Sequence, residues 1–187
     1  MQLSIDKRHE LVYNGIVINK EANTMKWFSN PQTLEQLKKQ YKKLAMQHHP
    51  DIGGSVTNMQ EINGEYDNLF ELLKNTHQTA DGKTYKAKTE TTETAAEFKD
   101  IINRLINLQG ITIEVCGSWL WITGDTYQHR EILKELKFRF SKSKTAWYYH
   151  NEGYRKNHSK IYTLDEIRDL YGSETVMNKP SLQLQVI

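Results

Sequence analysis

The chain has few of the residues that tie small proteins together through covalent bonds or metals. Cys116 is the single cysteine among 187 residues, which excludes an internal disulfide and a cysteine-built zinc site. A lone thiol is typical of a protein in a reducing cytoplasm. The sequence has no apolar run that approaches a membrane span, and its first ten residues lack the apolar core of a signal peptide. We therefore expect a soluble, cytoplasmic protein without membrane contacts.

The chain also carries little excess charge. The formal net charge is +2, so an argument for an acidic partner must rest on local clusters of lysine and arginine. Nucleophile signatures, glycine-rich phosphate loops and metal-ligand spacings are missing as well. The adjacent histidines His48 and His49 point about 100° apart on a helix, and no third ligand follows at a suitable spacing. We expect no enzyme activity, no catalytic residue, no metal and no cofactor.

The clearest positive pattern is a pair of amphipathic helices joined by a short loop. Apolar residues recur at helical spacing over residues 33–48 and again over residues 59–73. Thr33 is a good N-cap for the first helix. The loop between the helices carries His49-Pro50-Asp51 and then Gly53-Gly54, which favours an antiparallel helical hairpin with the tripeptide at its tip.

This hairpin resembles the J domain of DnaJ-type co-chaperones, similar to small J-domain proteins of Gram-positive bacteria and their mobile elements. The matching residues are TLEQLKKQYKKLAMQHHPDIGG and, after it, MQEINGEYDNLFELL. The resemblance implies one partner, a DnaK-type chaperone ATPase whose ATP hydrolysis is stimulated. In that contact Pro50 stiffens the corner, His49 offers one donor and one acceptor, and Asp51 offers a carboxylate to an arginine. The residue after Asp51 departs from the pattern, since Ile52 stands where a basic residue is common.

Four lysines lie on the helix before the corner: Lys38, Lys39, Lys42 and Lys43. At 100° per residue they gather on the side away from Leu37, Tyr41 and Leu44. By the resemblance, this basic face meets an acidic surface of the ATPase and steers its approach. The alternative is an ordinary solvated helix face.

The predicted fold class is α+β, with an N-terminal J-domain-like helical hairpin and a C-terminal small antiparallel sheet covered by helices. The predicted segments are a β-hairpin extension (1–23), the J-like domain (24–75), a flexible linker (76–94), an αββαββα domain (95–172) and a polar tail (173–187). The linker is rich in Thr, Lys and Glu without an apolar period, and Asp81-Gly82 indicates a turn in it. The end of the tail is β-prone and could add an edge strand.

A second candidate site lies in the C-terminal region, where residues 137–160 hold seven basic residues and one acid. Its candidate nucleic-acid contacts are Arg139, Lys142, Lys144, Tyr148, Arg155, Lys156 and Lys160. Cations beside aromatic rings suit single-stranded nucleic acid, because phosphates are neutralised while bases stack. Strand alternation puts Tyr148 on one sheet face and Trp147 with Tyr149 on the other, so one set is expected in the core. A solvated basic surface and a protein-docking patch are the alternatives.

Two functions follow from these patterns. The first is a co-chaperone that recruits a DnaK-type ATPase, while its C-terminal domain binds an unknown client protein or complex. The second is a nucleic-acid-binding protein that uses the helical hairpin as a scaffold.

Overall fold

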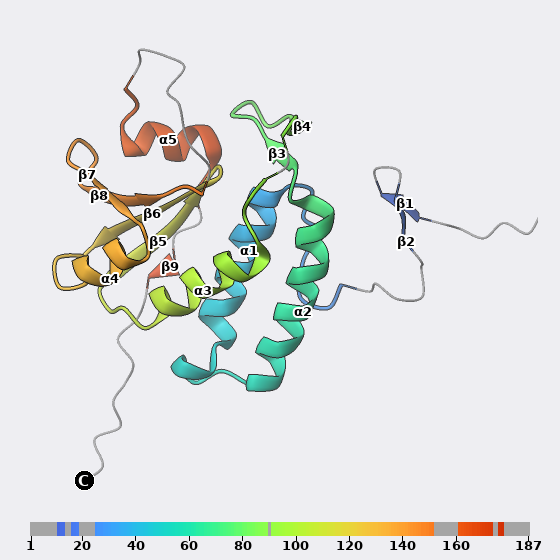
Figure 1. Cartoon of the computed structure of the whole chain (residues 1–187), viewed down its shortest axis with the longest axis horizontal. Helices are drawn as coiled ribbons and strands as arrows, with labels where there is room; N and C mark the ends of the chain where they lie inside the picture. Colours follow the sequence, from blue (N-terminus) through green and yellow to red (C-terminus); the bar gives the residue numbers. More distant parts are fainter. Residues whose placement is uncertain are drawn as a thin grey trace, which may run out of the picture.

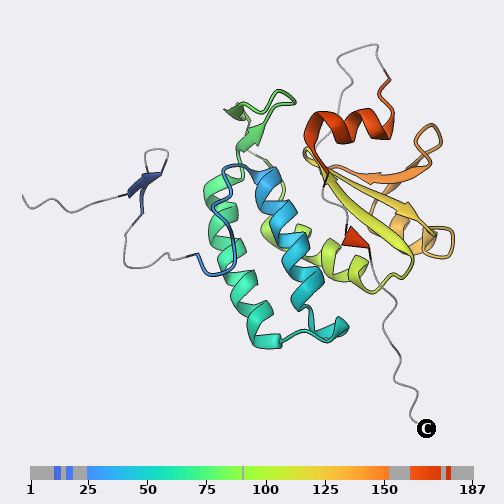
Figure 2. The same ribbon diagram turned by 180° about the vertical axis from the view of Figure 1, so that it is seen from behind.

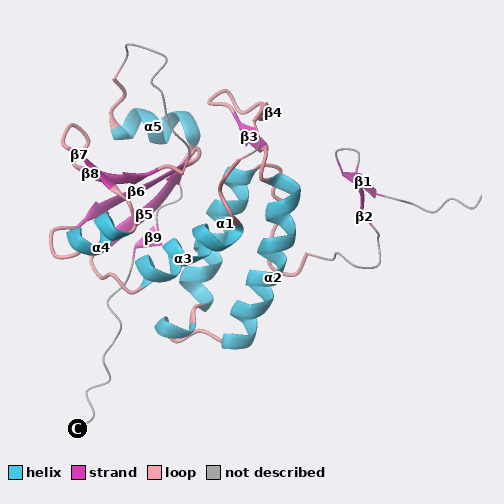
Figure 3. Cartoon of the chain, in the orientation of Figure 1, coloured by secondary structure: helices cyan, strands magenta, loops and turns pink. Residues whose placement is uncertain are grey.

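The helices and strands of the computed structural model alternate along the chain (Figures 1 and 3), and the structure describes residues 11–13, 16–18, 25–89, 91–151, 161–173 and 176–177. The helices are α1 (Leu34–His48), the short 3-10 helix η1 (Pro50–Ile52), α2 (Val56–Leu73), α3 (Ala95–Ile106), α4 (Arg130–Glu135) and α5 (Leu164–Tyr171). The strands are β1 (Leu11–Tyr13), β2 (Ile16–Ile18), β3 (Thr76–Gln78), β4 (Thr84–Lys86), β5 (Ile111–Cys116), β6 (Trp119–Gly124), β7 (Arg139–Ser141), β8 (Ala146–Tyr149) and β9 (Val176–Met177).

The α+β class predicted from the sequence is confirmed. A five-stranded antiparallel sheet has the order β7-β8-β6-β5-β9, and two further strand pairs, β1-β2 and β3-β4, are antiparallel hairpins. The antiparallel helices α1 and α2 lie beside the sheet, where α1 contacts β5 directly and α3 packs against both helices (Figures 1 and 2). The order α3, β5-β6, α4, β7-β8, α5 is the predicted αββαββα.

The helix boundaries follow from capping side chains. Thr33, as predicted, caps α1 by accepting a hydrogen bond from the backbone N–H of Gln36 at 3.3 Å. Thr163 and Glu166 form the reciprocal capping box that opens α5. Such caps satisfy N–H groups that have no partner within the helix, so the start of each helix is set locally.

Alternating side chains divide the sheet into two faces. Ile113, Leu120 and Ile122 are buried in the main core, which extends under α1, α2 and α3. Trp121 lies on the opposite face, in a smaller cluster with Leu164 of α5. The two sheet faces are therefore covered by different helices, α5 on one side and the helical hairpin on the other.

The helical hairpin and the sheet share one hydrophobic core, which differs from the predicted division into two domains. Phe98 of α3 is fully buried, and its ring centroid lies 6.0 Å from that of Tyr41 in α1 and 6.0 Å from that of Tyr66 in α2. The same buried cluster continues to Ile113 and Trp147 of the sheet. The apolar side chains of α3 therefore pack against the helical hairpin as well as against the sheet.

The expectation of a flexible linker over residues 76–94 is also corrected. Residues 76–86 form the β3–β4 hairpin, in which Gly82 adopts the predicted turn with a φ of 81°. The buried carboxylate of Glu35 anchors this hairpin: it accepts a hydrogen bond from the Gln78 N–H at 3.2 Å and lies 2.7 Å from His77 Nδ1. Because polar side chains hold this hairpin in place, residues 76–94 show no apolar period, and the sequence analysis did not predict the hairpin.

The two ends of the chain are partly described. β1 pairs with β2, as the predicted N-terminal hairpin requires, and β9 adds an edge strand to β5. The β-prone run predicted at residues 182–187 lies outside the described residues. In the described part of the chain, no helix combines the length and hydrophobicity needed to cross a membrane.

Candidate functional site

The corner between α1 and α2 is closed by a dense set of backbone hydrogen bonds. The carbonyl of His49 accepts from the N–H groups of Ile52 at 3.2 Å and Gly54 at 2.9 Å. The carbonyl of Pro50 accepts from the Gly53 N–H at 3.0 Å, and Gly53 has the left-handed φ of 92° that a glycine tolerates. Pro50 occupies the start of η1, where its missing N–H costs nothing.

Gly54 fixes the distance between the corner and the end of α1. A Cβ atom at this position would lie 2.1 Å from the carbonyl carbon and oxygen of His48, so only glycine fits the observed backbone. The corner therefore cannot widen or accept a side chain here without moving the end of α1. A loop held this way loses little conformational entropy when a partner binds it.

His49 and Asp51 present different groups at this corner. The Asp51 N–H donates to His49 Nδ1 at 3.2 Å, so the neutral imidazole carries its proton on Nε2. The His49 side chain is 12% exposed, whereas the Asp51 side chain is 52% exposed. The corner thus offers an accessible carboxylate beside a largely covered imidazole.

A residue that the sequence patterns did not point to also contacts the corner. The side-chain amide of Asn107, the C-cap residue of α3, donates to Asp51 Oδ2 at 2.8 Å. The two residues are 56 positions apart in the sequence, and no local motif links them. The contact arises because α3 packs along the hairpin and ends beside its tip.

The basic face predicted on α1 is not a solvent-exposed surface, and for Lys38 and Lys42 the prediction is corrected. Lys38 Nζ forms a buried ion pair with Glu93 Oε2 at 2.5 Å, both side chains being less than a tenth exposed. Lys42 is fully buried and donates to the carbonyl of Ile113 in β5 at 3.1 Å. The helical period correctly placed these lysines away from Leu37, but that side of α1 packs against the sheet instead of facing water.

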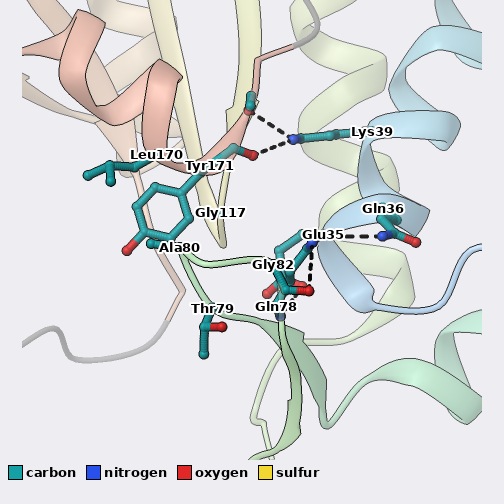
Figure 4. A pocket seen from close by; sticks show the side chains of 11 residues that line it. Glu35, Gln36, Lys39, Gln78, Thr79, Ala80, Gly82, Gly117, Leu170 and Tyr171 are labelled. Atoms are coloured by element: carbon teal, nitrogen blue, oxygen red, sulfur yellow. Dashed lines mark hydrogen bonds between the residues drawn. The ribbon is translucent and has the colours of Figure 1, made fainter.

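The ammonium of Lys39 also forms hydrogen bonds within the chain. It donates to the carbonyl oxygens of Tyr171 at 2.9 Å and Gly172 at 2.8 Å, at the end of α5 (Figure 4). A cation at this position satisfies carbonyls that have no partner within the helix. Among the four predicted lysines, Lys43 is the exposed one.

The second candidate site is partly assembled in the described residues. Arg139 and Tyr148 are directly opposite each other on β7 and β8, so they share the sheet face that carries Trp121. Lys142 is exposed and Lys144 half-buried in the turn between these strands. Arg155, Lys156 and Lys160 lie outside the described residues, so their placement stays a prediction.

The aromatic residues separate between the two sheet faces as the alternation predicts. Trp147 is buried in the main core, and Tyr149 packs against that core. Tyr148 belongs to the opposite cluster, where its ring centroid lies 5.6 Å from that of Trp121 and 5.5 Å from that of Trp119.

Comparisons of the chain with protein-family models, with curated proteins and with solved structures found no match. The resemblance to J domains therefore depends on the residues of the helical hairpin and its corner.

Proposed function

We propose that this chain is a J-domain-type co-chaperone that recruits a DnaK-type chaperone ATPase and stimulates its ATP hydrolysis. The observation that carries the proposal is the locked corner, which presents the Asp51 carboxylate beside the His49 imidazole at the tip of a helical hairpin. A fixed pair of this kind suits recognition more than catalysis, because neither group faces a nucleophile or a metal site in the described residues.

The chemistry of the corner favours a cationic, planar group on the partner. A carboxylate accepts about four hydrogen bonds, so the single bond from Asn107 leaves Asp51 able to receive a two-pronged arginine. His49 adds an Nε2–H donor next to it. Because the loop is already fixed by its own backbone, most of this interaction energy is available for binding.

The packing of the chain limits which residues can contact the ATPase. Lys38, Lys39 and Lys42 bind groups that follow the helical hairpin in the chain, so in this arrangement they cannot meet an acidic surface on a partner. The proposed contact therefore consists of the corner and Lys43. We expect its electrostatic steering to be weaker than that of a helix with four free lysines.

The test is ATP hydrolysis by a purified DnaK-type ATPase under single-turnover conditions, with and without the full chain. We expect wild type to accelerate hydrolysis and His49→Gln or Asp51→Asn to remove the acceleration. His48→Gln is the matched control: it makes the same chemical change one residue earlier, where the ring packs 5.0 Å from that of Trp27. Acceleration that survives both corner variants, or that is absent in wild type with every candidate ATPase, would refute the proposal.

The remaining assignments accompany this function. We assign the chain to the cytoplasm, since a DnaK-type ATPase works there and a lone cysteine suits a reducing compartment. The sheet and its helices would hold a client or complex near the recruited ATPase. The chain would have no catalytic activity of its own.

A further inference from the structure

A large groove lies on the sheet face opposite the main core. Its cavity volume is about 890 Å³, at the upper end of the range typical of ligand sites. The β3–β4 hairpin forms one wall and α5 the other, and both elements lie at the same end of the molecule in Figures 1 and 2. Side chains from β6 and β8 contribute the floor.

The floor of this groove is aromatic. Trp119 and Trp121 stack with an angle of 18° between their planes and a centroid distance of 6.0 Å, and Tyr148 packs against both. Tyr148 is half-buried, so part of its ring is accessible from the groove. The indole N–H of Trp121 is buried without a hydrogen-bond partner among the described residues. A protein core seldom leaves such a donor unsatisfied, so this face is polar as well as aromatic.

The charges around the groove favour an anionic occupant. Lys144, in the turn of the β7–β8 hairpin, lines the groove. Arg139 is the cross-strand neighbour of Tyr148, and Lys142 lies in the same turn two residues before Lys144. No acidic side chain of the described residues forms an ion pair with any of these three cations. The two carboxylates that line the groove are already engaged: Glu35 with His77, and Glu93 with Lys38.

We propose that this groove binds single-stranded nucleic acid, with a base stacked on Tyr148 and phosphates on Lys144 at the groove and on Arg139 and Lys142 beside it. Unpaired bases are planar and aromatic, and they alternate with anionic phosphates, which matches a ring flanked by cations that form no ion pair with the described acidic residues. In a duplex the same bases are stacked inside the helix and cannot reach the floor. An unfolded polypeptide offers no regular negative charge to these cations. The proposal is independent of the co-chaperone function.

The test is fluorescence anisotropy of a labelled oligothymidylate of about 15 nucleotides, titrated with the full chain at several salt concentrations. Three neutralised phosphates predict that log K falls against log salt with a slope of about −2. We expect Lys142→Glu combined with Lys144→Glu to weaken binding by about tenfold or more and to flatten the slope by about 1.4. Lys134→Glu with Lys137→Glu is the matched control, since it makes the same charge change before the β7–β8 hairpin begins, at residues that do not line the groove.

Aromatic stacking is tested separately from charge. We expect Tyr148→Ala to lower the affinity by about fivefold to 150-fold, while Tyr148→Phe keeps the ring and retains binding. Phe140→Ala is the control for loss of an exposed ring: Phe140 is 47% exposed, and its partner across the strands is Trp147, on the opposite face from Tyr148. Circular dichroism of each variant checks that it is folded.

Three results would overturn the proposal. The first is equal affinity of wild type and the Lys142/Lys144 double variant. The second is binding of a duplex of the same length as tightly as the single strand. The third is displacement of the oligonucleotide by a permanently unfolded polypeptide at similar concentration, which would assign the groove to protein clients.

Discussion

Phe98→Ala is the substitution that best tests whether the helical hairpin and the sheet form one cooperative unit. The Phe98 side chain is 1% exposed and contacts the rings of Tyr41 and Tyr66, and the ammonium of Lys38 lies 5.0 Å from its centroid. Truncating a buried phenylalanine typically costs about 3–5 kcal/mol, because apolar contacts are lost and a cavity remains. Small proteins have a free energy of unfolding of about 5–15 kcal/mol, so this loss is a large share of the total.

The measurement is urea unfolding followed by two signals from different parts of the chain. Far-ultraviolet circular dichroism reports mainly the helices, and tryptophan emission reports mainly the sheet, which holds three of the four tryptophans, Trp119, Trp121 and Trp147. We expect the two signals to coincide in wild type and to shift together in Phe98→Ala. With a slope of ~2 kcal/mol per molar urea, the midpoint should fall by about 1.5–2.5 M. Phe140→Ala, which removes a half-exposed ring 5.5 Å from that of Trp147, should lower the free energy of unfolding by only about 0.5–1.5 kcal/mol.

A different pattern would refute the shared core. If the helices of Phe98→Ala unfolded early while the sheet kept its wild-type midpoint, the hairpin would be a separate domain. The two-domain division predicted from the sequence would then stand, and the burial of Lys38 and Lys42 would not persist in solution.

Three further measurements address the corner and two titrating groups. Gly54→Ala should destabilise the chain and abolish ATPase stimulation, because its Cβ would lie 2.1 Å from the His48 backbone. Gly64→Ala, which enters open space inside α2, should stabilise it by up to about 1 kcal/mol in the same urea assay. Burial first, and then the charges of two nearby carboxylates, raise the pKa of Tyr149 to about 12 from an ordinary 10.0. As the pH rises, the phenol of Tyr149 therefore loses its proton earlier in the unfolded chain than in the folded chain. The contribution of this group to the free energy of unfolding is complete below pH 10 and disappears toward pH 12. Tyr149→Phe should make alkaline unfolding less steep in that window. Burial raises the pKa of the Cys116 thiol, so a thiol reagent at pH 8 should react slowly with the native chain and rapidly in urea; fast native labelling would contradict that burial.

Features that depend on local chemistry were predictable from the sequence. The cap of Thr33, the turn at Gly82 and the alternation along residues 146–149 each depend on a few neighbouring residues. The locked corner was predictable in the same way, because its proline and glycines are typical of a tight turn. Local rules of this kind gave the order of helices and strands correctly, although they underestimated the structure within residues 76–94.

Features that depend on distant partners were not predictable from the same patterns. Lys42 was assigned to an exposed basic face from the helical period and the resemblance, yet its ammonium reaches a carbonyl of β5, 71 residues away in the sequence. Asn107 gave no signal at all, since an asparagine that follows a helix is common as a cap. Likewise, α3 reads as part of the sheet domain until Phe98 is seen packed against the ring pair of Tyr41 and Tyr66.

These distant contacts change what the candidate site can do. A helix face that is held by the sheet cannot at the same time attract an acidic partner, so the proposed ATPase contact depends on short-range recognition at Asp51 and on Lys43. Short-range hydrogen bonds are less sensitive to salt than the attraction of several exposed lysines. Stimulation by this chain should therefore decline only slightly between low and physiological salt. A steep decline would mean that Lys38 and Lys42 are released from Glu93 and Ile113 before the ATPase binds, and that the packed arrangement is the resting state of the chain.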